Sequence, residues 1–415
     1  MDTILDRTIV LDLSRDRAGA YATGLLAGFG AQVIKIEPPL AGDPLRLDGP
    51  FASGRADGET GAPHLFLNAG KQSVTLDIGR PDGRALLEAL LQRAVVLVDS
   101  RSAAEASALS LTYESLGSRF PHMVVTSITP FGRSGPYADV PATELTLEAL
   151  AGWTYLIGDQ DREPLRCGAD VGHYLTGTNA AMHTLAALWH REATGQGQHV
   201  DVSVLETLCV MLGITGFFSN WTHDNQIRVR NGQRPPVARD AAAGPTRRMP
   251  WAGATTMLPC ADGWLAIAAQ SAAQWEGLCT MIGRPDLVEL ARGADGEIIE
   301  RTREETEVAL IDGFKDKTRA ELFELGGMFR CPTGIAYDVL EIAADPHLAE
   351  RGFFRHVEHP LAGMLAMPGS PWEFGAASWA QGRAPLLGEH NEAVYGELLG
   401  LSKTKLARLH ADDVI

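Results

Sequence analysis

Short runs of β-branched residues alternate with helical patterns along the first 130 residues. Strands are predicted at residues 8–13, 32–37, 73–78, 95–98 and 123–128. Helices are predicted at residues 18–29 and 82–93, where Leu86, Leu87, Leu90 and Leu91 share one face of the second helix. This alternation is typical of an α/β fold with a parallel sheet covered by crossover helices.

The pattern changes after residue 139. Residues 139–212 are mostly helical in pattern, and residues 224–249 are rich in Arg, Gly and Pro with little periodicity, which indicates a linker or mobile loop. A hairpin at residues 257–268 and helices at 273–282 and 305–322 indicate a smaller α+β unit, with a return to the first domain near Cys331. The predicted domains are a large domain at 1–224, a small domain with its linker at 225–330, and a return to the large domain at 331–415.

Composition excludes several classes of partner. Lys and Arg number 36 against 52 Asp and Glu, and the net charge of −16 argues against nucleic acid or an anionic membrane as a general partner, but allows a local basic pocket. Residues 207–223 are the most membrane-like stretch, yet polar and glycine residues interrupt them and they are too short to span a bilayer, so we expect a buried helix.

The cysteines and the N-terminal residues bear on localisation. The five cysteines are widely spread and form no CxxC, so neither a disulfide framework nor a zinc site is predicted. The first residues lack the basic start and cleavage site of a signal peptide. We therefore expect a cytoplasmic protein with reduced thiols.

A dinucleotide-dependent dehydrogenase is one alternative, because strand, helix, strand and then Glu37 imitate a Rossmann unit with its ribose-binding acid. The glycines argue against it. Gly19, Gly24, Gly28 and Gly30 do not form GxGxxG at the strand-to-helix turn, which reads SRDRAGA, so the pyrophosphate would lack its cradle.

Seven motifs in order give a more specific hypothesis. They are VLDLSRDRAGAYATGLLAGFGAQVIKIEPP, LNAGKQSVTLDIGRPDGRALL, SITPFGRSGPYAD, HREATGQGQHVDVSVLET, ADGWLAIAAQSAAQWEGLC with GRPDL, ADPHLAERGFF and LLGEHNEAVYGELLGLS. Together they resemble the family III CoA transferases, the CaiB/BaiF group. The resemblance implies a Rossmann-like large domain built from both chain ends, a smaller middle domain, and two subunits interlocked as rings. It also implies CoA or acyl-CoA as a substrate and no permanently bound cofactor.

The nucleophile position departs from the family. The run PLRCGADVGHYLTG, at residues 164–177, resembles the stretch that holds the family's nucleophilic Asp, and His173 stands in its place. In the family the carboxylate carbon carries CoA as an enzyme thioester, and imidazole has no carbonyl carbon. His173 is therefore interpreted as a degenerate site or as a base for hydrolysis or proton abstraction.

Two further alternatives exist for the catalytic group at this site. Asp170 is the nearest carboxylate that could substitute, but in an extended segment three residues would move it roughly 10 Å and to the opposite face. An epimerase branch of the family uses a His where Thr143 stands here, with Glu144 matching an acidic neighbour. Because both expected bases are missing, the sequence argues against an epimerase.

The family's CoA contacts are partly present. By resemblance, Asp16, Arg17 and Ala18 would contact CoA, as would Asn68, Gly70 and Lys71. Lys71 either meets a phosphate or is an exposed, solvated loop residue. A third segment is eroded, since residues 100–101 read Ser-Arg where Asn-Phe is expected and Ala108 replaces an Arg. We therefore expect reduced or lost CoA affinity, and binding of CoA by the partner subunit alone is one alternative.

Both departures favour a subunit that is non-catalytic alone. The resemblance implies heteromers in which an Asp-bearing paralogue carries the chemistry and its sister does not, as in succinyl-CoA:benzylsuccinate CoA transferase. The predicted function is such a sister subunit, moving CoA from an acyl-CoA to a small carboxylic acid together with its partner. The alternatives are a homodimeric acyl-CoA hydrolase or atypical transferase using His173 or Asp170, and a scaffold or regulatory protein.

Overall fold

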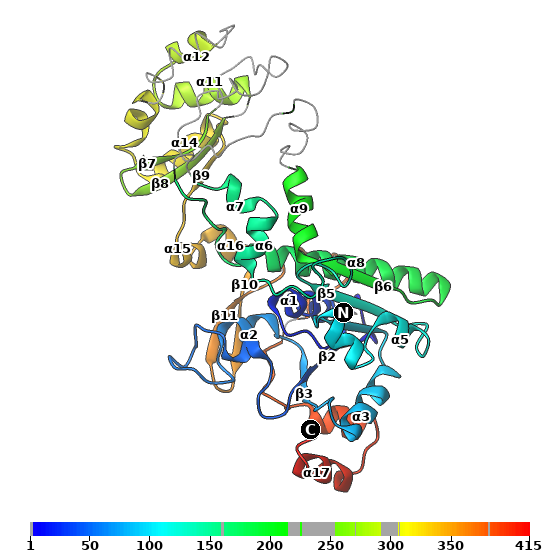
Figure 1. The fold of residues 1–415 in the computed structure, drawn as a ribbon. Coiled ribbons are helices and arrows are strands. Elements are labelled where there is room, and N and C mark those ends of the chain that lie inside the picture. The colour runs from blue at the N-terminus through cyan, green and yellow to red at the C-terminus, as the bar shows by residue number, and fades with distance from the viewer. Residues whose placement is uncertain are drawn as a thin grey trace. The chain divides into compact units, whose positions relative to one another are not determined.

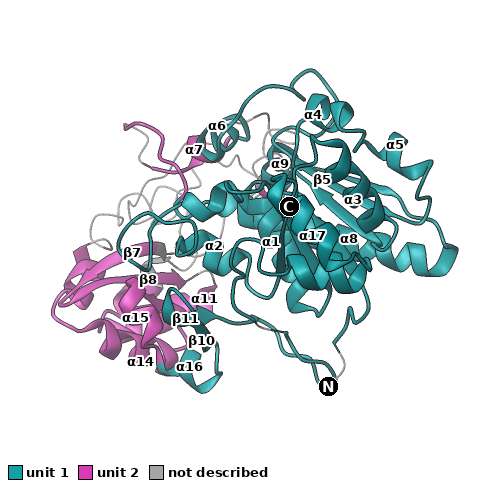
Figure 2. Cartoon of the chain, turned by 90° about the horizontal axis from the view of Figure 1, so that it is seen from below, with its two compact units in different colours: residues 1–151, 168–210, 346–415 teal, residues 152–167, 211–345 magenta. Residues whose placement is uncertain are grey.

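A computed structural model describes residues 3–158, 162–214, 225, 254–269, 271–291, 306, 308–380 and 382–415. The chain divides into two compact units, coloured in Figure 2. The large unit comprises residues 1–151, 168–210 and 346–415, and the small unit comprises 152–167 and 211–345. The chain therefore returns to the large unit at residue 346, whereas the sequence predicted this return near Cys331. The predicted domain boundaries at residues 224 and 330 stay a prediction.

The large unit contains a six-stranded parallel sheet in the order β3-β2-β1-β4-β5-β6, which Figure 1 shows with helices on both sides. Its strands are β1 (Ile9–Asp12), β2 (Gln32–Glu37), β3 (Gln72–Thr75), β4 (Val96–Asp99), β5 (Val124–Thr129) and β6 (His199–Ser203). All the pairings are parallel, with Leu11 opposite Ile34 and Leu97. The predicted α/β fold class is confirmed, and the five predicted strands lie within three residues of the observed bounds.

Two helices cover one face of this sheet. α1 (Arg17–Gly28) and α8 (Val171–Thr194) pack on it through small side chains such as Ala22 and Ala180, against the sheet residues Val10 and Val96. The predicted helix at residues 18–29 corresponds to α1. Small residues on both helices allow α1 and α8 to approach each other and the sheet closely.

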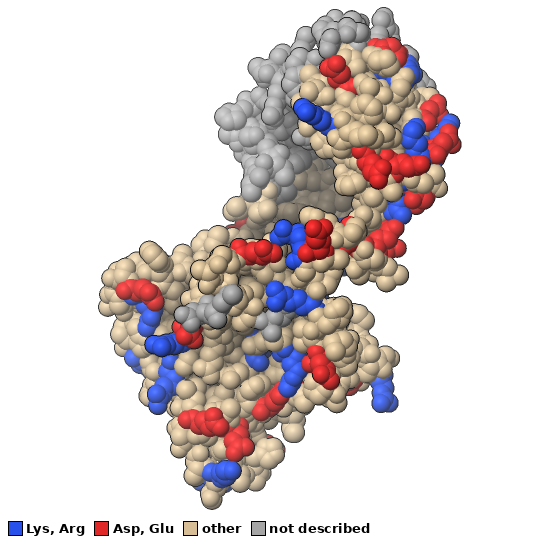
Figure 3. All heavy atoms as spheres, turned by 180° about the vertical axis from the view of Figure 1, so that it is seen from behind, with Lys and Arg blue, Asp and Glu red and all other residues tan. Residues whose placement is uncertain are grey.

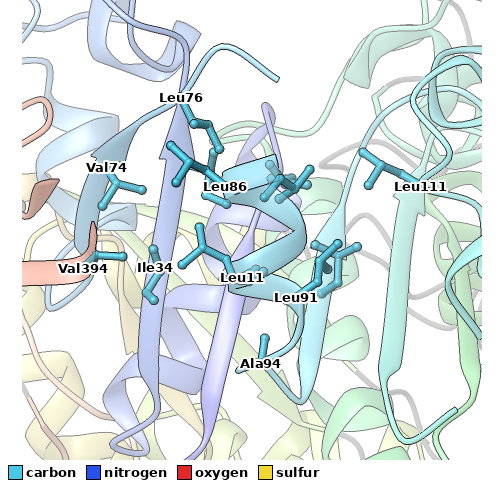
Figure 4. Packing of buried hydrophobic residues seen from close by; sticks show 14 of the residues in the cluster. Leu11, Ile34, Val74, Leu76, Leu86, Leu91, Ala94, Leu111 and Val394 are labelled. Atoms are coloured by element: carbon cyan, nitrogen blue, oxygen red, sulfur yellow. The ribbon is translucent and has the colours of Figure 1, made fainter. Parts of the chain in front are cut away.

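The opposite face is covered from both ends of the chain. α3 (Pro81–Leu91) turns Leu86 and Leu91 toward Leu11 and Ile34, as Figure 4 shows. Val394, far along the chain, joins the same cluster beside Val74. Nonpolar side chains on both faces of the strands are what a doubly covered parallel sheet requires.

The C-terminal segment contributes no strand to the parallel sheet but completes the large unit. It contains α16 (Pro346–Glu350), the hairpin β10 (Phe354–His359) and β11 (Gly363–Pro368), the π-helical η2 (Glu392–Leu398), and α17 (Lys403–Ala411). The buried Tyr395 hydroxyl donates to the Thr75 carbonyl at 2.9 Å, and the Asp77 amide donates to the Val414 carbonyl at 2.8 Å. These bonds fix the C-terminus beside β3, where Figure 1 shows it.

Shorter elements connect the strands of the large unit. They are η1 (Pro44–Leu47), α2 (Ala62–Leu67), α4 (Ala103–Ala108), α5 (Tyr113–Gly117) and α6 (Glu144–Leu150). α9 (Val204–Ile214) follows β6 directly and overlaps the start of the helix predicted at residues 207–223. The remainder of that stretch, residues 215–223, lies outside the described residues.

The small unit is an α+β structure. Its three-stranded sheet has the order β7-β8-β9, with antiparallel pairings, and its described elements include α7 (Trp153–Leu156), β7 (Ala254–Cys260), β8 (Gly263–Ala269), α11 (Ala272–Met281), α12 (Asp286–Ala291), α14 (Arg319–Met328), β9 (Thr333–Ile335) and α15 (Val339–Ala343). The predicted hairpin and the helix at residues 273–282 are confirmed.

One helix prediction in the small unit is wrong. The sequence indicated a continuous helix over residues 305–322, but the helix covering 308–314 ends before a turn, and α14 begins after Thr318. The Thr318 side chain and Glu321 form a capping box that starts a new helix there. Of the predicted linker at residues 224–249, only Asn225 lies within the described residues.

The surface and the helices bear on the predicted partners. On the face shown in Figure 3, basic and acidic side chains are interspersed among the described residues. Among those residues, no helix is long and apolar enough to cross a membrane. Neither observation changes the interpretation drawn from the net charge.

Candidate active site

Buried charges lie where strands β1 and β4 end. Asp12 ends β1 and is fully buried, and it accepts hydrogen bonds from Ser14, Thr23 and Lys71. Burial would raise the pKa of Asp12, but the charges of Lys35 and Lys71 hold it well below its usual range. Because carboxyl ends of parallel strands form the usual ligand edge of such folds, these charges lie at the base of a candidate site.

Lys71 belongs to this buried network and is not an exposed loop residue. Its Nζ lies 2.7 Å from the Thr23 hydroxyl, 2.8 Å from the Ala20 carbonyl and 2.8 Å from Asn68 Oδ1. Burial lowers the pKa of Lys71 to about 8 although Asp12 opposes the shift. The expectation of a solvated Lys71 is therefore wrong, and its amine is committed to protein oxygens.

The other two predicted residues of this loop also have local partners. The Asn68 amide lies 3.1 Å from His64 Nδ1, and Gly70, at a φ of 76°, donates its N–H to the Arg383 carbonyl at 2.9 Å. These contacts shape the turn between α2 and β3. A role for Asn68, Gly70 and Lys71 in binding CoA stays a prediction.

The turn after β1 supplies the next group of side chains. The Asp16 carboxylate caps α1 by accepting from the Gly19 amide at 2.8 Å, and burial raises its pKa. Arg17 pairs with Asp48 at 2.5 Å and with Asp170 at 2.8 Å. Ala18 is fully buried and offers no polar side chain. Of the three predicted residues, Asp16 and Arg17 therefore present charged groups at this edge.

The segment before α8 is not extended. Ala169 and Asp170 both adopt left-handed backbone conformations, with φ of 62° and 51°, and the helix begins at Val171. Non-glycine residues rarely adopt this conformation, so the turn is strained. The assumption of an extended segment from Asp170 to His173 is wrong, because His173 lies in the first turn of a helix that begins one residue after Asp170.

His173 lies in the first turn of α8 and pairs with a carboxylate. Its Nε2 is 3.1 Å from Glu144 Oε2, and the other oxygen of Glu144 accepts from the Gly172 amide at 2.6 Å. A Cβ at Gly172 would lie 2.8 Å from that oxygen, so glycine permits the close approach. His173 Nδ1 is buried and has no hydrogen-bond partner among the described residues.

His173 also belongs to the same edge of the sheet as Asp16. Arg17, in the turn after β1, pairs with Asp170 three residues before His173, and the Asp16 carboxyl accepts a hydrogen bond from Ser100, which follows β4. His173, Glu144, Asp16 and Arg17 therefore gather at the ends of β1 and β4. Chemically, an imidazole beside a carboxylate can accept a proton, but it offers no carbonyl carbon for CoA.

A pocket of about 510 Å³ opens at the carboxyl ends of β1, β2, β3 and β4. Nonpolar side chains such as Leu13, Ile36 and Leu76 line it together with Arg15, Arg80 and Arg101. The eroded segment borders this pocket through Arg101 and Leu109. Between them, α4 begins after the capping residue Ser102 and ends at the exposed Ala108. Arg101 is buried and pairs with Asp99 at 2.5 Å.

Sequence reasoning missed the partners of these groups. Glu144 was recognised only as an acidic neighbour, and Arg15, Arg80 and Arg101 were not singled out as pocket residues. The available signal was positional, because each arginine follows the end of a predicted strand by a few residues. Among the described residues, no group of His, Cys, Asp and Glu could hold a metal ion.

Comparison with known proteins agrees with this architecture. The family model described as CoA-transferase family III matches residues 5–391. The succinyl-CoA:(R)-benzylsuccinate CoA-transferase subunit BbsE of Thauera aromatica is 32% identical over 400 residues, covering 94% of this chain and 92% of that protein. The succinyl-CoA–D-citramalate CoA-transferase of Chloroflexus aurantiacus is 30% identical, covering 99% of this chain and 98% of that protein.

A solved structure is also similar. The crystal structure of a CaiB/BaiF family protein from Brucella suis superposes with a TM-score of 0.80 at 28% identity, covering 96% of this chain and all of that one. The similarity therefore extends over both compact units and is not confined to the parallel sheet.

Proposed function

The chain belongs to CoA-transferase family III, and from this premise we propose that it is the non-catalytic subunit of a heteromeric CoA transferase. Its partner is an Asp-bearing paralogue, and the enzyme moves CoA from an acyl-CoA to a small carboxylic acid. The observation that carries the proposal is the pairing of the His173 imidazole with Glu144, at the position where the sequence predicts the family's nucleophile.

The chemistry explains why His173 matters. A carboxylate attacks the donor thioester and releases CoA thiolate, giving a mixed anhydride; the thiolate then attacks the carboxylate carbon and releases the acyl group as its acid. CoA is thereby held as an enzyme thioester until the acceptor acid takes it. His173 cannot form this thioester, so the partner's Asp must supply the carbon.

Asp170 does not replace the missing carboxylate in this proposal. Its carboxylate lies 2.8 Å from Arg17 and is tied to the strained turn before α8. An ion-paired carboxylate is a weaker nucleophile because the cation stabilises its charge. The pairing supports a structural role in which Arg17 and Asp170 hold the start of α8.

The relatives support a heteromer and a substrate class. The Thauera aromatica relative is described as a transferase subunit, and both curated relatives are named for succinyl-CoA. We therefore propose a dicarboxylic acyl-CoA as the donor. An interlocked assembly of the two chains and a cytoplasmic location are parts of the same proposal.

The proposal predicts activity only in the complex. After co-expression with an Asp-bearing paralogue, the complex should transfer CoA from succinyl-CoA to a carboxylic acid. Chromatography of reactions with a panel of carboxylic acids measures this transfer. His173→Ala in this chain should leave the rate within about twofold, whereas replacing the partner's Asp by Ala should abolish transfer. The isolated chain should form no hydroxylamine-sensitive CoA adduct, and an adduct mapped to Asp170 by peptide mass spectrometry would contradict the proposal.

One observation favours a second candidate, an acyl-CoA hydrolase. The Glu144–His173 pair could orient the imidazole as a general base for water attack on a thioester. This candidate requires the isolated chain to hydrolyse acyl-CoA at an ordinary enzymatic rate, on the order of 1 to 1000 per second. It also requires His173→Ala and Glu144→Gln to abolish that hydrolysis, an outcome that would displace the heteromer proposal.

A further inference from the structure

A second pocket lies in the large unit, away from the candidate active site. Its volume is about 470 Å³, and residues between 348 and 379 in the C-terminal segment form its walls. An aromatic cluster joins this pocket to Phe29, which is the C-terminal cap of α1, whereas Asp16 caps the other end of that helix. Because α1 has 12 residues and a helix rises about 1.5 Å per residue, the cluster lies roughly 18 Å from Asp16.

Aromatic side chains form the nonpolar wall of this pocket. The Trp372 ring stacks on the Phe29 ring with 5.7 Å between centroids, and the Trp379 ring meets Phe29 and Trp372 edge-on at 5.4 and 5.7 Å. Phe374 also lies on the wall, meets Phe29 edge-on at 6.1 Å and is 46% exposed. Aromatic rings of this kind offer a planar ligand both stacking and edge-to-face contacts.

A glycine and several hydrogen bonds hold this wall in place. A Cβ at Gly28 would lie 2.0 Å from the Trp379 ring, so the indole can lie on α1 only because residue 28 is glycine. The Ala380 amide donates to the Gly28 carbonyl at 2.7 Å, which ties the same segment to the helix. The Ser370 hydroxyl donates to the Trp372 carbonyl at 2.7 Å and accepts from the Trp372 amide at 3.2 Å. The aromatic wall is therefore preorganised by the protein itself.

Two arginines lie beside the aromatic wall. The charged residues that line the pocket are Arg351, Arg355 and Glu373, and none of the three forms an ion pair within the part of the chain that the structure describes. Two arginines against one glutamate leave one positive charge in excess on the wall. A guanidinium without an ion pair keeps its N–H donors available, and two of them can bind both oxygens of one carboxylate.

The hairpin of β10 and β11 positions Arg355. This residue lies opposite Met367 in the hairpin, and a Cβ at Gly369 would lie 3.5 Å from Arg355 Nε, so the arginine side chain runs along the backbone at residue 369. The Gly369 amide donates to the Phe353 carbonyl at 2.7 Å, which closes this end of the hairpin. Arg355 and Phe353 therefore reach the pocket from one fixed backbone segment, so a cation and an aromatic ring are presented together.

We propose that this pocket binds an aromatic carboxylic acid, whose carboxylate pairs with the two arginines and whose ring packs against the aromatic wall. A monoanion matches the single positive charge in excess, and a planar body matches the rings that line the wall. The volume of about 470 Å³ is within the usual range for small-molecule sites. The site is separate from His173, and the inference does not depend on the proposed function.

Titration calorimetry of the full-length chain with phenylacetate tests the site. The wild type should bind phenylacetate saturably. Phenylacetamide keeps the ring but lacks the charge, and cyclohexylacetate keeps the charge but lacks the flat ring, so each should bind about fivefold more weakly or worse. Arg355→Ala should raise the Kd for phenylacetate about tenfold, and Phe374→Leu about threefold. Arg93→Ala, at an exposed position after α3, removes one positive charge as the matched control and should leave the Kd unchanged.

Three results would overturn the inference. The first is a wild-type chain that does not bind phenylacetate, and the second is binding by Arg355→Ala and Phe374→Leu that equals binding by Arg93→Ala. The third is a Kd that rises in His173→Ala but not in Arg355→Ala, which would place the acid at the candidate active site.

Thermal unfolding of each variant checks that the fold is retained. Arg355 is exposed, so Arg355→Ala is informative even if Phe374→Leu unfolds. Because calorimetry measures no turnover, the result stands whether the isolated chain is inactive or hydrolyses acyl-CoA.

Discussion

Single residues at the sheet edge are held by buried ion pairs. Glu37 ends β2, is 1% exposed, and accepts two hydrogen bonds from Arg46, at 2.6 Å from Nε and 2.9 Å from Nη2. Burial alone would raise the pKa of Glu37, but the bonds and charge of Arg46 lower it to about 2. A carboxylate held in this way stabilises the fold only while it is ionised.

Stability should therefore fall in acid in a way that depends on Glu37. Because its folded pKa lies below its unfolded value of 4.5, the unfolded chain takes up a proton first as pH falls. Stability on the order of 3 kcal/mol should be lost between about pH 4.5 and pH 2. Urea unfolding should show a weaker pH dependence for Glu37→Gln, and that variant should be about 3 to 5 kcal/mol less stable at pH 7.

The control for this prediction is Glu350→Gln, at an exposed position in α16. It should keep the wild-type pH dependence and lie within about 0.5 kcal/mol of wild-type stability. If Glu37→Gln lost as much stability in acid as the wild type, other carboxylates would govern the loss of stability and the prediction would be contradicted.

At the scale of elements, the contact between α1 and α8 determines where the site residues lie. α1 starts at Arg17 and α8 starts one residue after Asp170, and these two residues form an ion pair across the helix starts. Gly177 allows the close approach, since a Cβ there would lie 2.7 Å from the Ala18 carbonyl oxygen and 3.0 Å from the Tyr21 ring. The contact with Ala18 is with backbone, which cannot move aside as a flexible side chain can.

Gly177→Ala should consequently destabilise the protein despite the better helix propensity of alanine. The propensity gain of about 1 kcal/mol is smaller than the cost of separating two packed helices, so we expect a net loss of about 1 to 2 kcal/mol. Urea unfolding measures the difference. Thr178→Ala, at the adjacent exposed position, should change stability by about 0.5 kcal/mol or less, and a stabilised Gly177→Ala would refute the packing argument.

At the scale of the whole molecule, the two ends of the chain complete one core. Val394 and Tyr395 come from η2 and pack in the cluster that contains Val74 and Leu86. Tyr395 is fully buried, and its hydroxyl donates to the Thr75 carbonyl in β3. The last 70 residues therefore support a strand near the start of the chain, with the small unit's residues 211–345 inserted between them.

Removing this contact should destabilise the large unit in two separable steps. Tyr395→Phe deletes only the hydroxyl and should cost about 1 to 2 kcal/mol, because the Thr75 carbonyl loses its donor. Tyr395→Ala adds a cavity and should cost about 3 to 5 kcal/mol. Leu361→Ala, at a side chain 58% exposed, is the control. Equal stability of all three variants in urea would contradict a shared core.

The sequence by itself determined the class of fold and the family. Strand positions followed from apolar runs because a doubly covered parallel strand must be nonpolar on both faces, and β2 was predicted at its observed bounds. That His173 stands where the family's Asp is expected was read from the run at residues 164–177 and stays a prediction. Family membership was predicted from seven motifs that occur in the family's order, which can be read without a structure. The match to the family model confirms this prediction.

Only the tertiary structure decided which groups meet. Lys71 was expected in a loop but is buried, because Asp12, Thr23 and Asn68 enclose its amine from three separate segments. Asp170 was placed far from His173 because an extended segment was assumed, whereas the chain turns into α8 at Val171. Local sequence specifies periodicity and caps, but the partner of a charge depends on contacts between distant segments, and burial then decides its strength.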